Sequence, residues 1–107
     1  LEMPMPYLIQ VTEKSNIREI FEDTLPTHRS YLEPFIPKML AIGALLEEDG
    51  SRAGGAIIIL DTEERQEAED FINNDPLYLA GLFECVSITK WRKFIYNGEL
   101  MPQMESF

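Results

Sequence analysis

The seven residues Gly55-Ala56-Ile57-Ile58-Ile59-Leu60-Asp61 contain the longest apolar run of the chain, from Ala56 to Leu60. A run of this length, rich in β-branched side chains and bounded by turn residues, predicts a β-strand. Neighbouring side chains of a strand point to opposite faces of its sheet. Because four large apolar residues follow one another, we expect both faces of this strand to be buried.

Three further strands are expected on either side of this one. They lie at residues 7–12, at about 41–46, and within 83–95, where Trp91 stands near the end.

Two helices and one helical turn separate these strands. The first helix is expected to start at Asp23 to Pro26, and its apolar face carries Leu25, His28, Leu32 and Phe35 at steps of three and four. The second helix follows Asp61-Thr62-Glu63-Glu64, which has the spacing of a capping box, and ends at Asn73-Asn74. A further helical turn begins at Asp75-Pro76 and ends at Gly81.

The resulting order, β-α-β-β-α-β, predicts an α+β protein of ferredoxin-like topology. Its four-stranded antiparallel sheet would carry both helices on one face. The second face of the apolar strand then needs another cover. In a chain of 107 residues a second copy is the simplest one, so we expect a two-fold homodimer with sheets stacked face to face.

Composition and charge exclude several classes of function. The chain has 19 acidic and 9 basic residues and a formal net charge of −10, which disfavours nucleic acid and anionic membrane surfaces as partners. No apolar run approaches the roughly 20 residues of a membrane span. With one cysteine, Cys85, no intramolecular disulfide can form, and we expect a cytoplasmic protein.

No cofactor or metal is predicted. One histidine and one cysteine are too few for a structural zinc site, and no glycine-rich phosphate loop occurs. Cys85 lies among strand residues and is expected to be a small buried side chain.

The single histidine, His28, lies on the apolar face of the first helix, so it should point toward the sheet. It is either a general acid or base in a pocket or a buried histidine bonded to a carbonyl group. Asp75, directly before Pro76, is typical of the cap of the helical turn that follows.

The stretch Asn74-Asp75-Pro76-Leu77-Tyr78-Leu79-Ala80-Gly81-Leu82, after an acidic helix and before a strand ending at Trp91, resembles the YciI-like (YCII-related) family. The position of His28 in the first helix also matches. The resemblance covers residues 6–96, which we take as one domain, and leaves 97–107 as a C-terminal tail.

The resemblance implies a ferredoxin-like fold, a dimeric α+β barrel, and a dyad of His28 and Asp75. A dehydrochlorinase activity on a chlorinated hydroxyquinol is known in the family. The family often has an arginine three residues before the histidine, where this chain has Leu25. Arg29 is the candidate to replace it, although its neighbour position on a helix turns it about 100° away from His28.

Two tyrosines are candidates for contact with a ligand. Tyr31 follows His28 by one helical turn, and Tyr78 follows Asp75 by three residues. Either hydroxyl could orient a ligand or donate a proton, and each is also typical of a core residue with a polar tip.

We therefore expect a small cofactor-independent enzyme that transfers protons on a small polar or aromatic molecule, as a lyase or isomerase does. The alternative is a non-catalytic dimeric ligand-binding or accessory module in which His28 and Asp75 are structural. Geometry separates the two hypotheses. An enzyme needs a pocket lined by His28, with Asp75 within hydrogen-bond reach of roughly 2.6–3.2 Å.

Overall fold

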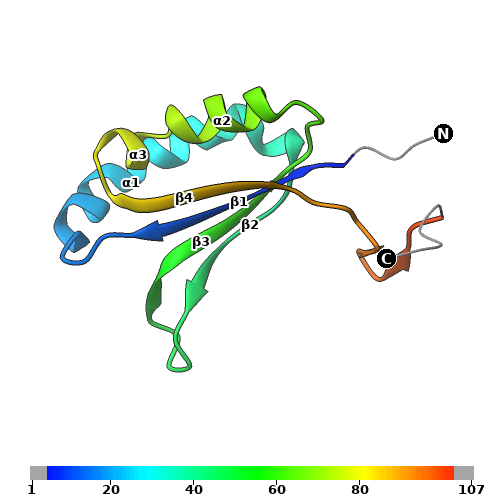
Figure 1. The fold of residues 1–107 in the computed structure, drawn as a ribbon. Helices are drawn as coiled ribbons and strands as arrows, with labels where there is room; N and C mark the ends of the chain where they lie inside the picture. Colours follow the sequence, from blue (N-terminus) through cyan, green and yellow to red (C-terminus); the bar gives the residue numbers. More distant parts are fainter. Residues whose placement is uncertain (1–4, 103–107) are drawn as a thin grey trace.

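The computed structural model describes residues 5–102 of the chain (Figure 1). The elements, in order, are β1 (Tyr7–Glu13), α1 (Arg18–Leu32), the 3-10 helix η1 (Glu33–Lys38), β2 (Met39–Leu46), β3 (Arg52–Leu60), α2 (Arg65–Asn73), α3 (Pro76–Leu79), β4 (Phe83–Lys90), β5 (Ile95–Tyr96) and β6 (Glu99–Leu100). No helix in this part of the chain is long and apolar enough to cross a membrane.

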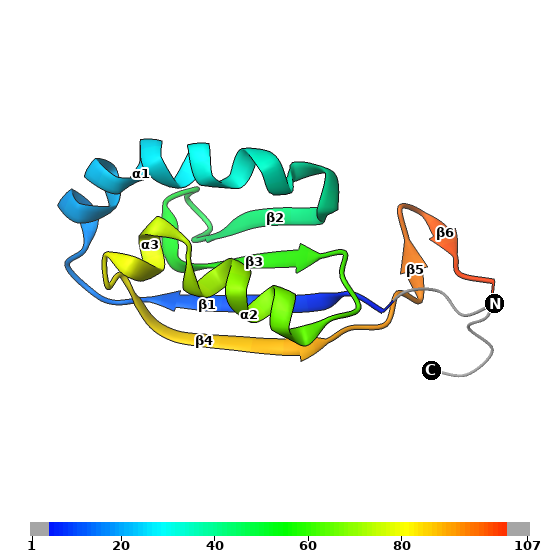
Figure 2. The same cartoon turned by 90° about the horizontal axis from the view of Figure 1, so that it is seen from above.

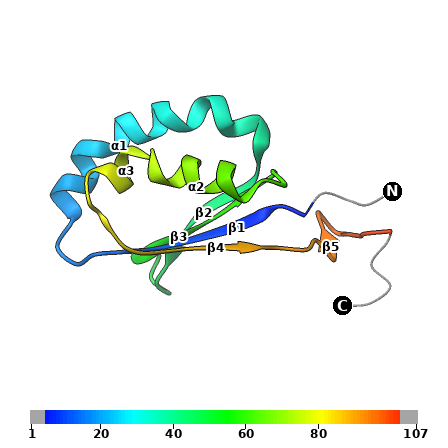
Figure 3. The same ribbon diagram turned by 45° about the horizontal axis from the view of Figure 1, so that its top comes forward.

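The four long strands form one antiparallel sheet in the order β2-β3-β1-β4 (Figure 2). The three α-helices lie together on one face of this sheet (Figures 1 and 3). This arrangement confirms the α+β, ferredoxin-like fold. The short helix α3 is the helical turn expected at Asp75-Pro76.

The core lies between this sheet and the helices. In the sheet register, Ile9 of β1 stands opposite Ile58 of β3 and Ile88 of β4, so these side chains share the helix-facing side. The buried core cluster consists of Tyr7, Ile9, Val11, Ile58, Leu60, Ala68, Phe71 and Ile72. Aromatic rings join the helical layer to this core: Phe35 packs edge-on against Phe71, with ring centres 4.9 Å apart.

The apolar strand β3 divides its side chains between the two faces as expected. Ile58 and Leu60 are buried under the helices, whereas Ile57 and Ile59 point to the opposite face and are only half-buried. Ile57 pairs with Gln10 on one side and Gly43 on the other. No helix of the described chain covers this second face, which we call the open face.

Helix α1 begins earlier than the sequence predicted. It starts at Arg18, six residues before Thr24, and contains Pro26 in its interior. A proline there removes one helical hydrogen bond, a cost that tertiary packing must offset. The half-buried positions Phe21, Leu25 and His28 continue one face across the proline. That packing explains why the helix does not stop there.

Helix α2 begins later than predicted. Glu64 is its N-cap residue and makes no side-chain cap bond, so the expected capping box at Asp61 is wrong. Thr62 takes the role instead. Its hydroxyl accepts a hydrogen bond from the Glu64 N–H at 3.1 Å and donates one to the Glu67 carboxylate at 2.8 Å.

The segment after β4 contains a small hairpin that the sequence analysis missed. Strands β5 and β6 are joined by Asn97 and Gly98, both with positive φ. An Asn-Gly pair with this geometry is the usual two-residue hairpin turn. The signal was therefore present in the sequence.

Candidate active site

His28 lies on the inner side of α1, in line with Leu25 one turn before it and Leu32 one turn after it. Its side chain is 14% exposed. Helix α1 packs against α3, which brings the ring close to the start of α3. The apolar face of α1 thus places one polar ring at the border between core and solvent.

Asp75 is buried at the start of α3. Its backbone is extended, and Pro76 occupies the first helical position. The carboxylate oxygen Oδ1 accepts a hydrogen bond from the Leu77 N–H at 2.9 Å, as a helix cap does. The Asp75 side chain is 1% exposed.

The fold brings His28 and Asp75 together although 47 positions separate them. His28 Nδ1 and Asp75 Oδ1 are 2.8 Å apart, which confirms the predicted hydrogen-bond reach. A carboxylate can only accept, so the bond assigns the proton to Nδ1. The neutral ring then carries its free lone pair on Nε2, where a base must have it.

The hydroxyl of Tyr31 makes a hydrogen bond within the helical layer, between α1 and α2. It donates a hydrogen bond to the carbonyl oxygen of Phe71 at 2.8 Å. Burial of the hydroxyl raises the pKa of Tyr31, and the negative charges of Asp75 and Asp70 raise it further. A cavity adjoins His28 and Asp75, and Tyr31 is not among the described residues that line it.

The other two ligand candidates, Tyr78 and Arg29, do not line the cavity beside His28 and Asp75 either. Tyr78 is 41% exposed and packs its ring against Phe83, with ring centres 6.4 Å apart. Arg29 is exposed in the last turn of α1. The structure therefore joins His28 with Asp75 and leaves Arg29, Tyr31 and Tyr78 apart from their contact.

Cys85 is exposed, so the expectation of a buried thiol is wrong. It stands opposite Thr12 in the β1–β4 pairing, on the open face. The helices cover only the other face of the sheet. The signal was present in the sequence, because Val86 and Ile88 alternate with Ser87 and Thr89, which places Cys85 on the polar side of β4.

A cavity of about 140 Å³, which we call the inner cavity, adjoins the dyad. His28, Asp75, Glu13 and Arg52 are its ionisable lining residues, and its other walls are mostly apolar: Val11, Phe21, Leu25, Ile42, Gly43, Ala44, Ala56, Ile58, Leu77 and Phe83. A histidine base at the wall of a mostly apolar cavity can act on an uncharged ring or carbonyl compound.

Sequence reasoning missed Glu13 and Arg52, which are paired at this cavity. The Arg52 guanidinium donates a close hydrogen bond to the Glu13 carboxylate, and the Glu13 side chain is 6% exposed. Glu13 and Arg52 are 39 positions apart, so no local spacing pattern in the sequence links them. The pairing of β1 with β3 brings them together, because Thr12, next to Glu13, stands opposite Gly55 near the start of β3.

Comparisons with known proteins agree with this fold. The sequence matches the family model of the YCII-related domain over residues 5–92. It is similar to 5-chloro-2-hydroxyhydroquinone dehydrochlorinase (TftG) from Burkholderia phenoliruptrix, solved in complex with 2,5-dihydroxybenzoquinone. The two chains are 28% identical with a TM-score of 0.74, over 82% of this chain and 94% of that one.

A second solved structure shares the fold alone. It comes from Bacteroides thetaiotaomicron, is assigned as an antibiotic biosynthesis monooxygenase, and is 11% identical with a TM-score of 0.51, over 87% of this chain and 91% of that one. The comparison with curated proteins gives no match.

Proposed function

The chain belongs to the YCII-related family, and we propose that it is a small enzyme in which His28 is the general acid and base and Asp75 its positioning partner. The hydrogen bond of 2.8 Å between His28 Nδ1 and Asp75 Oδ1, at the wall of a mostly apolar cavity, carries this proposal. The substrate class is a small polar or aromatic molecule with an acidic C–H or O–H group.

In the proposed reaction, His28 Nε2 takes a proton from the substrate, and the Asp75 carboxylate stabilises the imidazolium that forms. In an elimination, the electrons of the broken C–H bond form a double bond, and the leaving group departs with its own bonding pair. In an isomerisation, the same proton returns to a different carbon atom. Neither path requires an oxidant or a reductant.

The similar dehydrochlorinase supports the elimination path, because its substrate is a chlorinated aromatic compound of this size class.

The alternative is a non-catalytic module that binds a small ligand. The bond from Leu77 N–H to Asp75 favours it, since a helix cap is a sufficient reason for an aspartate at this position. In that case His28 would serve as a hydrogen-bond partner and never exchange a proton with the ligand.

Solvent deuterium exchange separates these two functions without knowledge of the natural substrate. The protein is incubated in D₂O with a panel of hydroxylated aromatic and cyclic carbonyl compounds, and NMR follows their C–H signals. The enzyme hypothesis predicts exchange or product formation with at least one compound, and its loss in His28→Asn. Asparagine can still donate to Asp75 but offers no ring nitrogen as a base.

Exchange that persists unchanged in His28→Asn would contradict the role of His28. Ligand binding without any exchange or product across the panel would favour the non-catalytic module.

We further propose that the protein is a homodimer joined through the open face, as the apolar residues Ile57 and Ile59 suggest. A cytoplasmic location stays a prediction from the sequence.

A further inference from the structure

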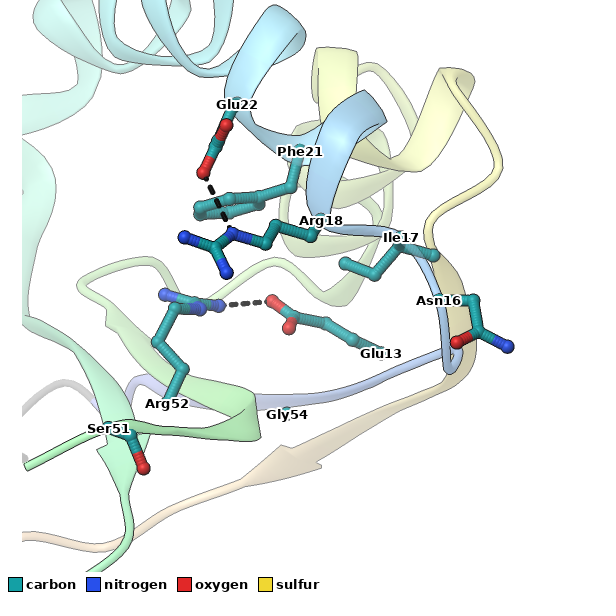
Figure 4. Close-up of a pocket in the computed structure, with 9 residues that line it drawn as sticks. All are labelled: Glu13, Asn16, Ile17, Arg18, Phe21, Glu22, Ser51, Arg52 and Gly54. Carbon is teal, nitrogen blue, oxygen red and sulfur yellow. Dashed lines mark hydrogen bonds and ion pairs between the residues drawn. The ribbon is translucent and has the colours of Figure 1, made fainter. Parts of the chain in front are cut away.

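The inner cavity adjoins a larger hollow between the start of α1 and the start of β3, which we call the outer cleft (Figure 4). The outer cleft has a volume of about 680 Å³. Glu13, Phe21 and Arg52 line both hollows. These three residues therefore stand where the cleft and the cavity meet, and a ligand that reaches His28 by this route passes them.

Arg52 is held at this junction from two sides. Its guanidinium donates to the buried carboxylate of Glu13, and its central carbon lies 4.3 Å from the ring centre of Phe21. Such contacts fix the plane of the group and reduce the freedom that binding would otherwise remove. The Arg52 side chain is still 39% exposed.

Most of the hydrogen-bonding capacity of Arg52 stays available. A guanidinium has five N–H donors, and within the described residues its one hydrogen bond goes to Glu13. Figure 4 shows the guanidinium groups of Arg52 and Arg18 pointing into the same cleft, where Arg18 is paired with Glu22 at 3.1 Å. The lining of the outer cleft thus carries two arginines and two glutamates, and the N–H groups of Arg52 that Glu13 does not use are donors within it.

The inner cavity has the size of one ring. A cavity of about 150 Å³ lined by apolar side chains can hold a benzene molecule, and this cavity measures about 140 Å³. A charged substituent on such a ring would find a cationic donor at Arg52, which lines both the inner cavity and the outer cleft.

We propose that this site selects a six-membered-ring substrate that bears a carboxylate, which the Arg52 guanidinium binds at the mouth of the inner cavity. The inference deepens the proposed function, since it assigns the substrate class of the same site. The planar fork of arginine matches a carboxylate, which accepts two parallel hydrogen bonds. Glu13 and Phe21 act as positioning residues for Arg52, and His28 meets the ring.

The test compares benzoate with benzamide, which has the same shape and no charge. Titration calorimetry of the full chain is expected to show tighter binding of benzoate. In Arg52→Met the dissociation constant for benzoate should rise about 10- to 100-fold, while that for benzamide changes little. The control Arg92→Met also removes one positive charge. Arg92 follows the end of β4, whereas Phe83 at the start of β4 lines the inner cavity, so the dissociation constants for benzoate and benzamide should stay unchanged.

Because Arg52→Met leaves the Glu13 carboxylate unpaired, the same titrations are made on the double variant Glu13→Gln, Arg52→Met. Loss of the benzoate preference in both variants supports the proposal. Equal binding of the two ligands by the wild type, a preference that survives in both variants, or no binding of either ligand overturns it.

Carboxylate binding by Arg52 and proton transfer by His28 can be tested separately. The benzoate preference should persist in His28→Asn, which lacks the base but keeps Arg52. If the preference is absent while proton exchange still depends on His28, only the carboxylate assignment is wrong.

Discussion

At Asp75 one carboxylate oxygen accepts hydrogen bonds from both the Leu77 N–H and His28 Nδ1. The same atom therefore caps α3 and orients the imidazole. An amide oxygen can accept both bonds as well, but it carries no negative charge. This difference allows the structural and the catalytic contributions of Asp75 to be measured separately.

We expect Asp75→Asn to keep most of the stability and lose most of the activity. Asparagine caps a helix about as well as aspartate, so the free energy of unfolding should change by less than about 1 kcal/mol. Without the carboxylate charge, the imidazolium is less well stabilised, and turnover should fall by about 100-fold or more. Urea unfolding and the deuterium-exchange assay measure the two effects.

Asp75→Ala and Asp23→Asn serve as controls. The alanine variant removes the cap and leaves His28 without its acceptor, which should cost about 1–3 kcal/mol of stability. Asp23 is exposed on α1, so Asp23→Asn removes one charge and should change neither quantity. Full activity in Asp75→Asn would mean that the charge has no part in catalysis.

Tyr31 joins two elements, because its hydroxyl on α1 donates to the Phe71 carbonyl near the end of α2. The last four carbonyl groups of a helix have no partner within the helix, so Tyr31 satisfies one of them. We expect Tyr31→Phe to lower the free energy of unfolding by about 1 kcal/mol near neutral pH.

The same contact predicts a loss of stability in alkaline solution. Burial first, and the charges of Asp75 and Asp70 second, raise the pKa of Tyr31 in the folded protein. An unfolded tyrosine loses its proton near pH 10, so above that pH the unfolded state binds fewer protons than the folded state. The contribution of Tyr31 to stability is present below about pH 10 and declines as the pH rises toward the folded pKa.

The difference in unfolding free energy between wild type and Tyr31→Phe should therefore shrink above about pH 10. Urea unfolding at several pH values measures this difference. A constant difference across the alkaline range would show that the Tyr31 hydroxyl titrates alike in both states.

For the whole molecule, the open face makes assembly testable. Light scattering at low micromolar concentration is expected to give twice the 12.3 kDa mass of one chain. Ile57→Lys places a charge at the centre of this face and should yield the single-chain mass. Ile95→Lys, at a residue 61% exposed on the β5–β6 hairpin, is the matched control and should stay dimeric.

The single thiol reports on the same surface. Cys85 lies on the open face and is exposed in one chain, so a dimer joined there should slow its reaction with a thiol reagent. Ile57→Lys should restore fast labelling. A single-chain mass for the wild type together with fast labelling would contradict the dimer.

Much of this protein follows from local sequence. The apolar run at Ile57 to Leu60, the alternation in β1 and the Asp75-Pro76 cap each depend on a few neighbouring residues, and the strand order then leads to the ferredoxin-like sheet. The contact of His28 with Asp75 was also predictable, since both residues are placed by helices on the same face of that sheet. Local steric and hydrogen-bonding preferences determine such features before any long-range contact forms.

Tertiary structure alone decided the rest. Helix α1 continues through Pro26 because packing of its inner face outweighs one missing hydrogen bond. The meeting of Glu13 and Arg52 depends on the register between β1 and β3. These outcomes depend on contacts between residues far apart in the chain, whose energies exceed the local preferences that a sequence pattern expresses.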